Sequence, residues 1–333
     1  MFFVTFILFF IIMQLPAEQR VLVYVPAVNP HLEPEEYAQL LETLIERHGL
    51  NQPFPIQYVN WLRNLIQGQW GYSPHWQQSV LEGLRQRAPA TIELVLFALV
   101  PSIILAFVLG SLAAKHQERF PDYIVRAAAS MGWAFPSFIL GLMLMNVFYA
   151  WLGWFPPERL SVWASSVVRS DDFRAFTGMH TVDGLLNSDL ILLWDAVRHL
   201  VLPGVTLAAA QWALLTRIMR ASLLEALRQD YITTARAKGL HERKVVNLHA
   251  RRNAVLPVIS TAGVATSMLL SGVVVIEVIF NFNGVGRWAI QAVLHADIPV
   301  AVGFALFSCT VTVLASLVAD ILYAVVDPRV RLD

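Results

Sequence analysis

The stretch DYITTARAKGLHERKVVNLHARRNAVLPV, residues 230–258, places a basic segment directly before an apolar run. Asp230 occupies a position typical of a helix N-cap, and Tyr231–Lys238 suits a short helix. Gly239 follows where helices commonly end in the left-handed conformation, and Leu240 supplies the apolar neighbour of such an ending. We therefore predict a short helix that ends at a glycine turn.

A second helix is predicted after the turn, over Glu242–Arg252. Its apolar side comprises Val245, Val246, Leu248 and His249. Three interpretations fit such a pair of helices: an amphipathic hairpin on the membrane surface, a nucleic-acid-binding helix-turn-helix, or a docking site for a cytoplasmic partner. Nucleic acid is disfavoured because the pair lies between two apolar spans, and the details of the motif favour docking.

Composition places the chain in lipid. Hydrophobic residues make up 56% of the 333 residues and charged residues only 14%, whereas soluble domains carry roughly 25% charged residues. The formal net charge is zero, which gives no support to bulk attraction toward nucleic acid. The single cysteine, Cys309, excludes an intrachain disulfide and a thiolate metal cluster. We expect one membrane-embedded, all-α protein.

Six apolar stretches approach the roughly 20 residues that cross a bilayer. They cover residues 1–15, 91–114, 123–154, 199–221, 253–280 and 298–326. The first is short and lacks the basic start and cleavage site of a signal peptide, so we interpret it as a clipped first span. The predicted organisation is a first span over 1–15, an external helical segment over 16–90, and a transmembrane core over 91–333 with a cytoplasmic loop at about 222–253.

Charge distribution predicts the orientation. Residues 217–252 contain nine Lys or Arg against three acids, and short basic loops stay in the cytoplasm. The turn 113–122 carries Lys115 and Arg119, whereas 16–89 and 155–198 contain more acids than basic residues. Six spans then place both termini in the cytoplasm.

Prolines, small residues and acids mark special positions in the spans. Pro101, Pro136, Pro203 and Pro257 predict kinks. Gly263, Ser267 and Ser271 form a small-residue face that suits either packing within the bundle or a subunit interface. Three intramembrane acids are Glu93, Glu277 and Asp320. The first two are candidates for the pathway or for span-end caps, and Asp320 is expected to pair with Arg329 and Arg331.

The motif around residues 231–258 resembles the cytoplasmic loop signature of ABC-importer permeases, in the branch that imports dipeptides, oligopeptides and nickel. The matching residues are Tyr231, Thr234, Ala235, Arg236, Ala237, Lys238, Gly239 and Leu240. Thr233 replaces the usual Arg, and His241 replaces the usual Ser or Asp cap. Further segments resemble the family in its order, among them RAPATIEL from Arg87, HLVLPGVTLA from His199 and VVVIEVIFNFNGVGR from Val273.

The resemblance implies a type I importer fold and a non-catalytic subunit of an ATP-hydrolysing complex. Its implied partners are a second, similar permease, two cytoplasmic ATPase subunits that carry ATP and Mg, and an external binding protein. The loop 230–252 would couple to the ATPases, in a bacterial or archaeal cytoplasmic membrane. The chain has no G-x-x-x-x-G-K-[ST] loop for phosphate. Near the outer mouth, a gate is expected from Phe280, Asn281 and Phe282.

Two other classes compete with this interpretation. An ion-coupled secondary transporter would show internal repeats and paired acids in mid-span, and neither is evident. A membrane enzyme is weaker still, because the sequence contains neither HExxH nor GxSxG. Peptides, nickel chelates and oligosaccharides all remain open as substrates.

Overall fold

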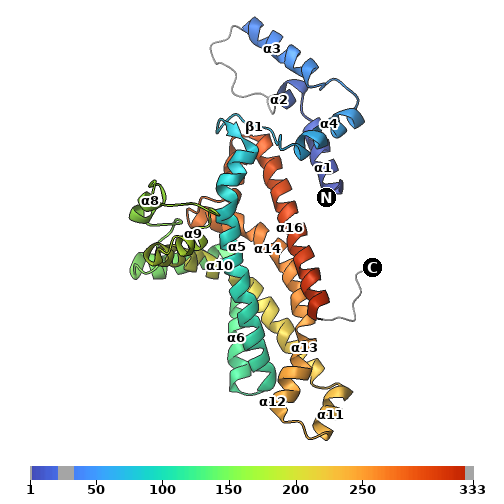
Figure 1. Cartoon of the computed structure of the whole chain (residues 1–333), viewed down its shortest axis with the longest axis vertical. Coiled ribbons are helices and arrows are strands. Elements are labelled where there is room, and N and C mark those ends of the chain that lie inside the picture. The colour runs from blue at the N-terminus through green and yellow to red at the C-terminus, as the bar shows by residue number, and fades with distance from the viewer. Residues whose placement is uncertain (1, 22–33, 327–333) are drawn as a thin grey trace. The chain divides into compact units, whose positions relative to one another are not determined.

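The computed structural model describes residues 2–21 and 34–326, and within these ranges the chain is almost entirely helical (Figure 1). The strands in this part of the chain are β1 (Tyr72–Ser73) and β2 (Gln78–Ser79), which form a short antiparallel hairpin. The sequence did not predict this hairpin. The all-α prediction is confirmed for the remaining elements.

The chain folds into two compact units. One combines Met1–Pro89 with Gly284–Val311, and the other combines Ala90–Asn283 with Thr312–Asp333. We call them the first and the second unit. Helices α5 (Val80–Lys115) and α16 (Ile298–Val326) each contribute one part to each unit. The division of the chain at residue 90 into an external segment and a core stays a prediction.

The first unit is built from short helices and the hairpin. Besides the starts of α5 and α16 it contains α1 (Phe2–Met13), α2 (Ala17–Val21), α3 (Pro34–Arg47), α4 (Phe54–Ile66) and α15 (Val285–Leu294). Tyr58 and Trp61 of α4 pack against Phe9 of α1 and Leu306 of α16. The helical prediction for the segment after the first span is therefore confirmed in its described residues.

The second unit is organised around one long helix, α10 (Leu190–Ala226). The side chain of Asp189 caps its first turn by accepting hydrogen bonds from the backbone N–H groups of Ile191 and Leu192. Against α10 pack α6 (Phe120–Ala134), α7 (Ser137–Leu144), α9 (His180–Leu186), α13 (Arg251–Ala254) and α14 (Leu256–Ile279). The unit also contains η1 (Met145–Trp151), α8 (Val162–Val168), α11 (Asp230–Ala237), α12 (Glu242–Lys244) and η2 (Val245–Ala250).

The predicted kinks differ in outcome. The chain bends by 104° between α6 and α7, at the break that contains Pro136. In contrast, α10 continues as a helix past Pro203, and α5 continues past Pro101. Pro257 lies in the first turn of α14, where a proline removes no helical hydrogen bond.

The number of spans stays a prediction. Among the described residues, α5, α10, α14 and α16 are long and apolar enough to cross a membrane, and the bent pair formed by α6 with α7 and η1 adds a fifth candidate. Helix α1 is apolar but has only 12 residues. Both α5 and α10 begin about ten residues earlier than the sequence predicted, because each helix continues through residues that precede its apolar run.

Packing within the chain accounts for part of the small-residue face on α14. A Cβ atom added at Gly263 would lie 2.9 Å from the Cβ atom of Ala319 on α16, so the glycine allows the two helices to approach. Ser271, at the other end of this face, is exposed. Asp320 is also exposed, and its predicted partners Arg329 and Arg331 lie outside the described residues.

Candidate functional site

Helix α11 ends at the glycine turn that the sequence predicted. The N–H of Leu240 donates to the carbonyl of Ala235 (3.3 Å), and the N–H of Gly239 donates to that of Arg236 (2.9 Å). This pair of bonds is a Schellman motif, and Gly239 adopts the left-handed φ of 75° that it requires. At the other end, Gln229 and not Asp230 occupies the cap position, because the helix begins one residue earlier than predicted.

The two faces of α11 differ in burial. Ile232 and Ala235 are buried in an apolar cluster that includes Leu223 of α10 and Val245 of η2. The exposed residues of the motif are Tyr231, Thr234, Arg236, Ala237, Lys238, Gly239 and Leu240. The helix is therefore fixed to the second unit by one face and presents the other to solvent.

An ion pair connects α11 to α12 across the turn. The guanidinium of Arg236 donates to both carboxylate oxygens of Glu242, from Nε to Oε2 at 3.1 Å and from Nη2 to Oε1 at 2.8 Å. This hydrogen bonding lowers the pKa of Glu242 below its ordinary value and raises the pKa of Arg236. Both side chains are about half exposed, so the pair restrains the turn without adding much stability.

The second predicted helix is present over residues 242–254, but it is not regular. His241 caps it by accepting a hydrogen bond from the N–H of Arg243 at its ring Nδ1 (3.2 Å). A π-helical stretch, η2, then shifts the register of the side chains. Val245 and Val246 are buried as predicted, but Leu248 is 63% exposed, and Ala250 lies in the core in its place. We call residues 230–254 the coupling segment.

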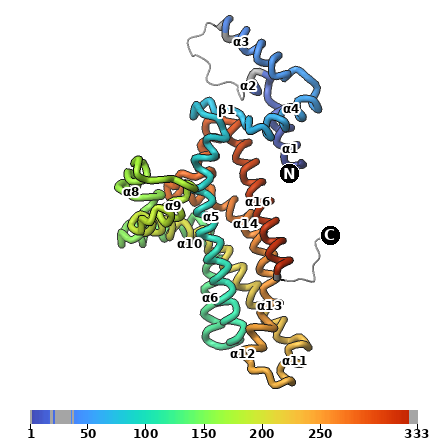
Figure 2. The backbone as a smooth tube through the Cα atoms, viewed as in Figure 1, coloured from blue at the N-terminus to red at the C-terminus, as the bar shows by residue number. Residues whose placement is uncertain are grey.

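An open groove of about 320 Å³ lies beside the start of α11. It is lined by residues from the end of α10, the start of α11 and the approach to α14: Ser222, Glu225, Ala226, Gln229, Tyr231, Asn253 and Pro257. Helix α11 lies at one end of the second unit (Figure 2), and the groove adjoins its start.

Glu93 of α5 is buried among hydrogen-bond donors. Nη2 of Arg159 lies 2.8 Å from Oε2 of Glu93. The backbone N–H and the hydroxyl of Thr181 donate to Oε1 at 2.7 and 2.8 Å. Glu93 is only 5% exposed, and burial of its charge would be costly without these partners. The carboxylate thus fastens two points of the segment 152–189 to α5.

The second predicted acid, Glu277 of α14, meets the same stretch of α5. Its side chain is fully buried, and its Oε1 accepts a hydrogen bond of 2.6 Å from the hydroxyl of Thr91. The sequence separated Glu93 from Glu277 by 184 positions, and the fold brings both to residues 91–93. We call Thr91, Glu93, Arg159, Thr181 and Glu277 the buried acid cluster.

The three predicted gate residues adjoin this cluster. Phe280 and Phe282 are buried, and the guanidinium of Arg159 lies 5.8 Å from the ring centre of Phe282. Asn281 has a left-handed φ of 53°, and its amide donates to Oε1 of Glu158 at 2.8 Å. The N–H of Glu158 in turn donates to the carbonyl of Phe280 at 2.8 Å. The loop after η1 is therefore hydrogen-bonded to the end of α14.

His180, at the start of α9, completes this region. Burial lowers its pKa to about 4, and the charge of Arg159 contributes in the same direction, while Glu93 and Asp183 oppose the shift. Its ring Nδ1 is buried and has no hydrogen-bond partner among the described residues. The imidazole is therefore neutral at neutral pH.

No direct signal in the sequence identifies the partners of the acids. Arg159, Thr181 and Glu158 lie in a polar segment between predicted spans, and Thr91 lies at a span edge. A carboxylate in an apolar span does require a cation or several donors. That rule predicts a partner for Glu93, but it does not select Arg159 from the four arginines of residues 155–198.

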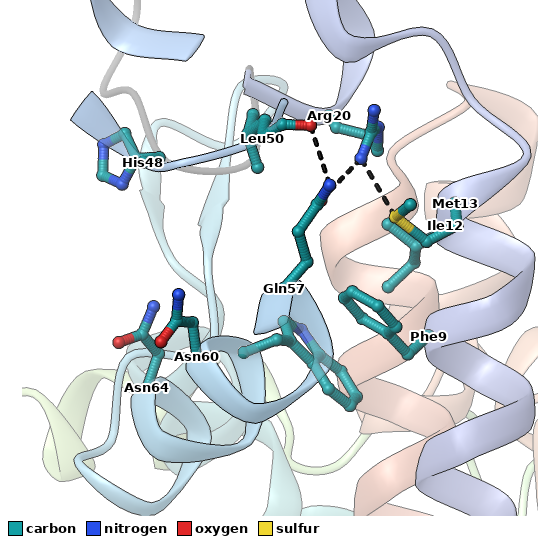
Figure 3. A pocket seen from close by; sticks show the side chains of 10 residues that line it. Phe9, Ile12, Met13, Arg20, His48, Leu50, Gln57, Asn60 and Asn64 are labelled. Carbon is teal, nitrogen blue, oxygen red and sulfur yellow. Dashed lines mark hydrogen bonds between the residues drawn. The ribbon is translucent and has the colours of Figure 1, made fainter. Parts of the chain in front are cut away.

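The first unit contains a separate small cavity of about 40 Å³. Figure 3 shows Arg20 and Gln57 at its edge: Nη1 of Arg20 donates to Oε1 of Gln57 at 2.7 Å and to Sδ of Met13 at 3.0 Å. The amide of Gln57 donates to the carbonyl of Leu50 at 2.8 Å. Ligand pockets typically measure about 300–1,000 Å³, so this cavity does not hold a peptide.

Among the described residues, no three His, Cys, Asp or Glu side chains are grouped in a way that would hold a metal ion.

Comparison with known proteins connects this geometry to one family. The profile of the family described as binding-protein-dependent transport system inner membrane component matches residues 106–332. The dipeptide transport system permease protein DppB of Alkalihalophilus pseudofirmus is 34% identical over 293 residues, which cover 88% of this chain and 86% of the relative. The di/tripeptide permease protein DppB of Pseudomonas aeruginosa is 35% identical, with coverage of 99% and 94%. The oligopeptide permease protein AppB of Bacillus subtilis is 36% identical, with coverage of 87% and 84%.

The family profile spans the coupling segment, the buried Glu277 of α14 and the gate residues, and the relatives extend the similarity over the first unit. Membership implies a membrane-embedded, non-catalytic subunit that works with a substrate-binding protein and with ATPase partners. The chain belongs to the family of inner-membrane permease components of binding-protein-dependent transport systems.

Proposed function

We propose that this chain forms half of the translocation pathway of an ATP-driven importer of dipeptides or oligopeptides. The named relatives act on dipeptides, di- and tripeptides, and oligopeptides, which supports peptides over nickel chelates and oligosaccharides. The other half of the pathway comes from a second, similar permease. Two ATPase subunits bind ATP and Mg and hydrolyse the ATP, and an external protein delivers the peptide.

The observation that carries the proposal is the two-faced helix α11. Its exposed face, with Thr234, Arg236 and Lys238, docks on an ATPase subunit, and the adjoining groove receives a side chain of that subunit. Its buried face, through Ile232 and Ala235, is packed into the cluster that contains α10. Because packed side chains move together and do not deform continuously, a displacement of α11 is passed to the helices that it packs against.

Helix α10 carries the displacement toward the pathway. It packs against α6, α7 and α14, so a movement of α11 is passed to the helix that bears Glu277 and leads into the gate residues. Closure of the two ATPases brings the coupling segments of the two permeases together and opens the pathway to the outside. This is alternating access by rigid-body motion.

Phe280 and Phe282 form the gate in this scheme, and the buried acid cluster holds it. The loop that carries Glu158 and Arg159 is bonded both to Glu93 and to the end of α14. We place this gate at the outer mouth and the coupling segment in the cytoplasm, with both termini inside. Support comes from the nine basic residues of 217–252.

The experiment that tests the proposal is peptide uptake by proteoliposomes. The complex of both permeases and both ATPases is reconstituted with the binding protein outside and ATP inside. We expect dipeptide accumulation that requires ATP and the loaded binding protein, and no ATP hydrolysis by this chain alone. Uptake by this chain alone, driven by a proton or sodium gradient, would instead establish the ion-coupled alternative.

A further inference from the structure

Three basic side chains gather where α5 ends against the coupling segment. The ammonium of Lys115, the last residue of α5, donates to Oδ1 of Asn247 in η2 at 3.3 Å. Arg243 and Arg251 lie four residues before and after Asn247 in the same helical stretch, and the charges of both act on this ammonium. Like charges held together in this way repel one another, and the repulsion falls when an anion binds between them.

No carboxylate neutralises this group in the part of the chain that the structure describes. Of the acids on the same segments, Glu242 pairs with Arg236, and Asp122 accepts hydrogen bonds of 2.6 and 2.7 Å from Arg220. Glu118, three residues after Lys115 in the described part of the chain, forms no ion pair with it. The ion pairs of the described residues do not include Lys115, Arg243 or Arg251.

The environment of Arg251 also indicates that an acceptor is missing. Its guanidinium lies 5.2 Å from the ring centre of Phe107, and burial lowers its pKa. Its Nε is buried and has no hydrogen-bond partner among the described residues. A buried donor of this kind is expensive to leave unpaired, so the site favours an acceptor.

An exposed apolar stripe leads along α5 to the same place. Ile104, Val108 and Leu112 are spaced four residues apart, are 57%, 51% and 38% exposed, and lie on one helix face. Lys115 follows three residues later on that face. The stripe from Ile104 to Lys115 is about 16 Å long at the rise of an α-helix, roughly half the thickness of the hydrocarbon core. One acyl chain extends over the same depth.

We propose that Lys115, Arg243 and Arg251 bind the phosphate of an anionic phospholipid whose acyl chain lies along Ile104, Val108 and Leu112. A free phosphate would satisfy the three charges but would leave the apolar stripe without a role. Basic pockets at the membrane end of helices are known to suit anionic headgroups. The lipid would tie the end of α5 to the coupling segment, whatever solute is transported.

Photolabelling of the assembled complex tests this site. The complex is placed in nanodiscs that contain phosphatidylglycerol with a photoreactive group in its acyl chain, and the labelled residues are mapped. We expect adducts on the stripe 104–112, and weak labelling when the photoreactive lipid is zwitterionic phosphatidylcholine. Because each basic residue near an anionic surface contributes about fivefold in affinity, the double variant Lys115→Gln, Arg243→Gln should lower labelling by at least about fivefold.

The matched control is Lys244→Gln, Arg252→Gln, which removes the same charge from exposed positions of the same segment. Arg251 is left unchanged in both variants because it packs on Phe107. Equal loss in the control would mean that only general surface charge attracts the lipid, and equal labelling by phosphatidylcholine would also overturn the proposal. Displacement by excess inorganic phosphate would indicate a site for a soluble anion. Adducts on a partner subunit without adducts on the stripe would show that protein covers this face.

Discussion

The coupling segment and the buried acid cluster are both polar regions of the second unit, but they are stabilised in opposite ways. The ion pair of the coupling segment, Arg236 with Glu242, is about half exposed on both sides. In the ion pair of the acid cluster, the side chain of Arg159 is 15% exposed and that of Glu93 is 4% exposed. In the coupling segment, apolar anchors and the turn at Gly239 fix the geometry. In the acid cluster, charge burial fixes it. We therefore expect changes in the first region to alter transport, and changes in the second to alter stability as well.

The largest effect is expected for Arg159→Ala. The variant leaves the Glu93 carboxylate buried without its cation, which costs about 3–5 kcal/mol. The midpoint of thermal unfolding of the purified chain measures this loss. Arg169→Ala, at an exposed position of the same loop, should leave the midpoint unchanged.

A second variant separates charge burial from general damage to the loop. Adding Glu93→Gln to Arg159→Ala removes the uncompensated charge and should recover part of the lost stability. If the double variant is as unstable as the sum of two independent losses, the ion pair does not have the role given to it here.

The next effect in size is a pH dependence from His180. Its pKa falls from the ordinary 6.5 to about 4 in the folded chain, so the unfolded chain binds a proton that the folded chain does not bind. The contribution of the neutral imidazole to the free energy of unfolding is complete above pH 6.5 and is lost as the pH falls toward 4. The total is about 3 kcal/mol. The unfolding midpoint of the unmodified chain should therefore fall relative to that of His180→Asn as the pH is lowered from 6.5 to 4. A constant difference would contradict the assignment.

A smaller effect on the fold is expected for Gly239→Val. A Cβ atom there meets no other atom within 4 Å, so the cost is only the left-handed strain of about 1–2 kcal/mol. The chain should still accumulate in the membrane, while a displaced turn reduces peptide uptake. Gly239→Asn tolerates the left-handed conformation and should retain uptake. Uptake by the valine variant at the unmodified rate, with permease levels matched, would mean that the turn does not serve coupling.

The smallest effect is expected for Arg236→Gln. The pair with Glu242 is exposed and contributes at most about 0.5 kcal/mol. Because the pKa of Glu242 lies below its ordinary value of 4.5, the contribution is present above that pH and is lost as the pH falls below it. The unfolding midpoint at pH 7 should change less than in Gly239→Val, and a larger loss would place more of the stability in this pair than its exposure allows.

Local rules of sequence were sufficient for the end of α11 and insufficient for η2 and for the acid cluster. The end of α11 at Gly239 follows from backbone geometry within six residues, and the sequence predicted it. The exposure of Leu248 was not predicted, because a π-helical stretch shifts every later side chain and has no clear sequence signal. The pairing of Glu93 with Arg159 joins residues 66 positions apart, and only the fold selects one arginine from several.

The same distinction applies to the fold as a whole. Long apolar runs predicted α14 and α16 closely, since burial in lipid is set by composition over about 20 residues. The 104° bend between α6 and α7 was predicted only as a kink at Pro136, because a proline weakens a helix without fixing the angle that packing then selects. The hairpin of β1 and β2 was missed because each strand has only two residues.

The central claim is that the exposed face of α11 docks on an ATPase subunit, and site-specific crosslinking in the assembled complex tests it most directly. A photoreactive amino acid is introduced at Lys238, on the exposed side of α11, and in a second variant at Asn51, which is exposed in the first unit. We predict that Lys238 crosslinks to an ATPase subunit and that Asn51 does not. Crosslinks from Asn51 to an ATPase subunit, or from Lys238 to the external binding protein, would contradict both the orientation and the coupling role.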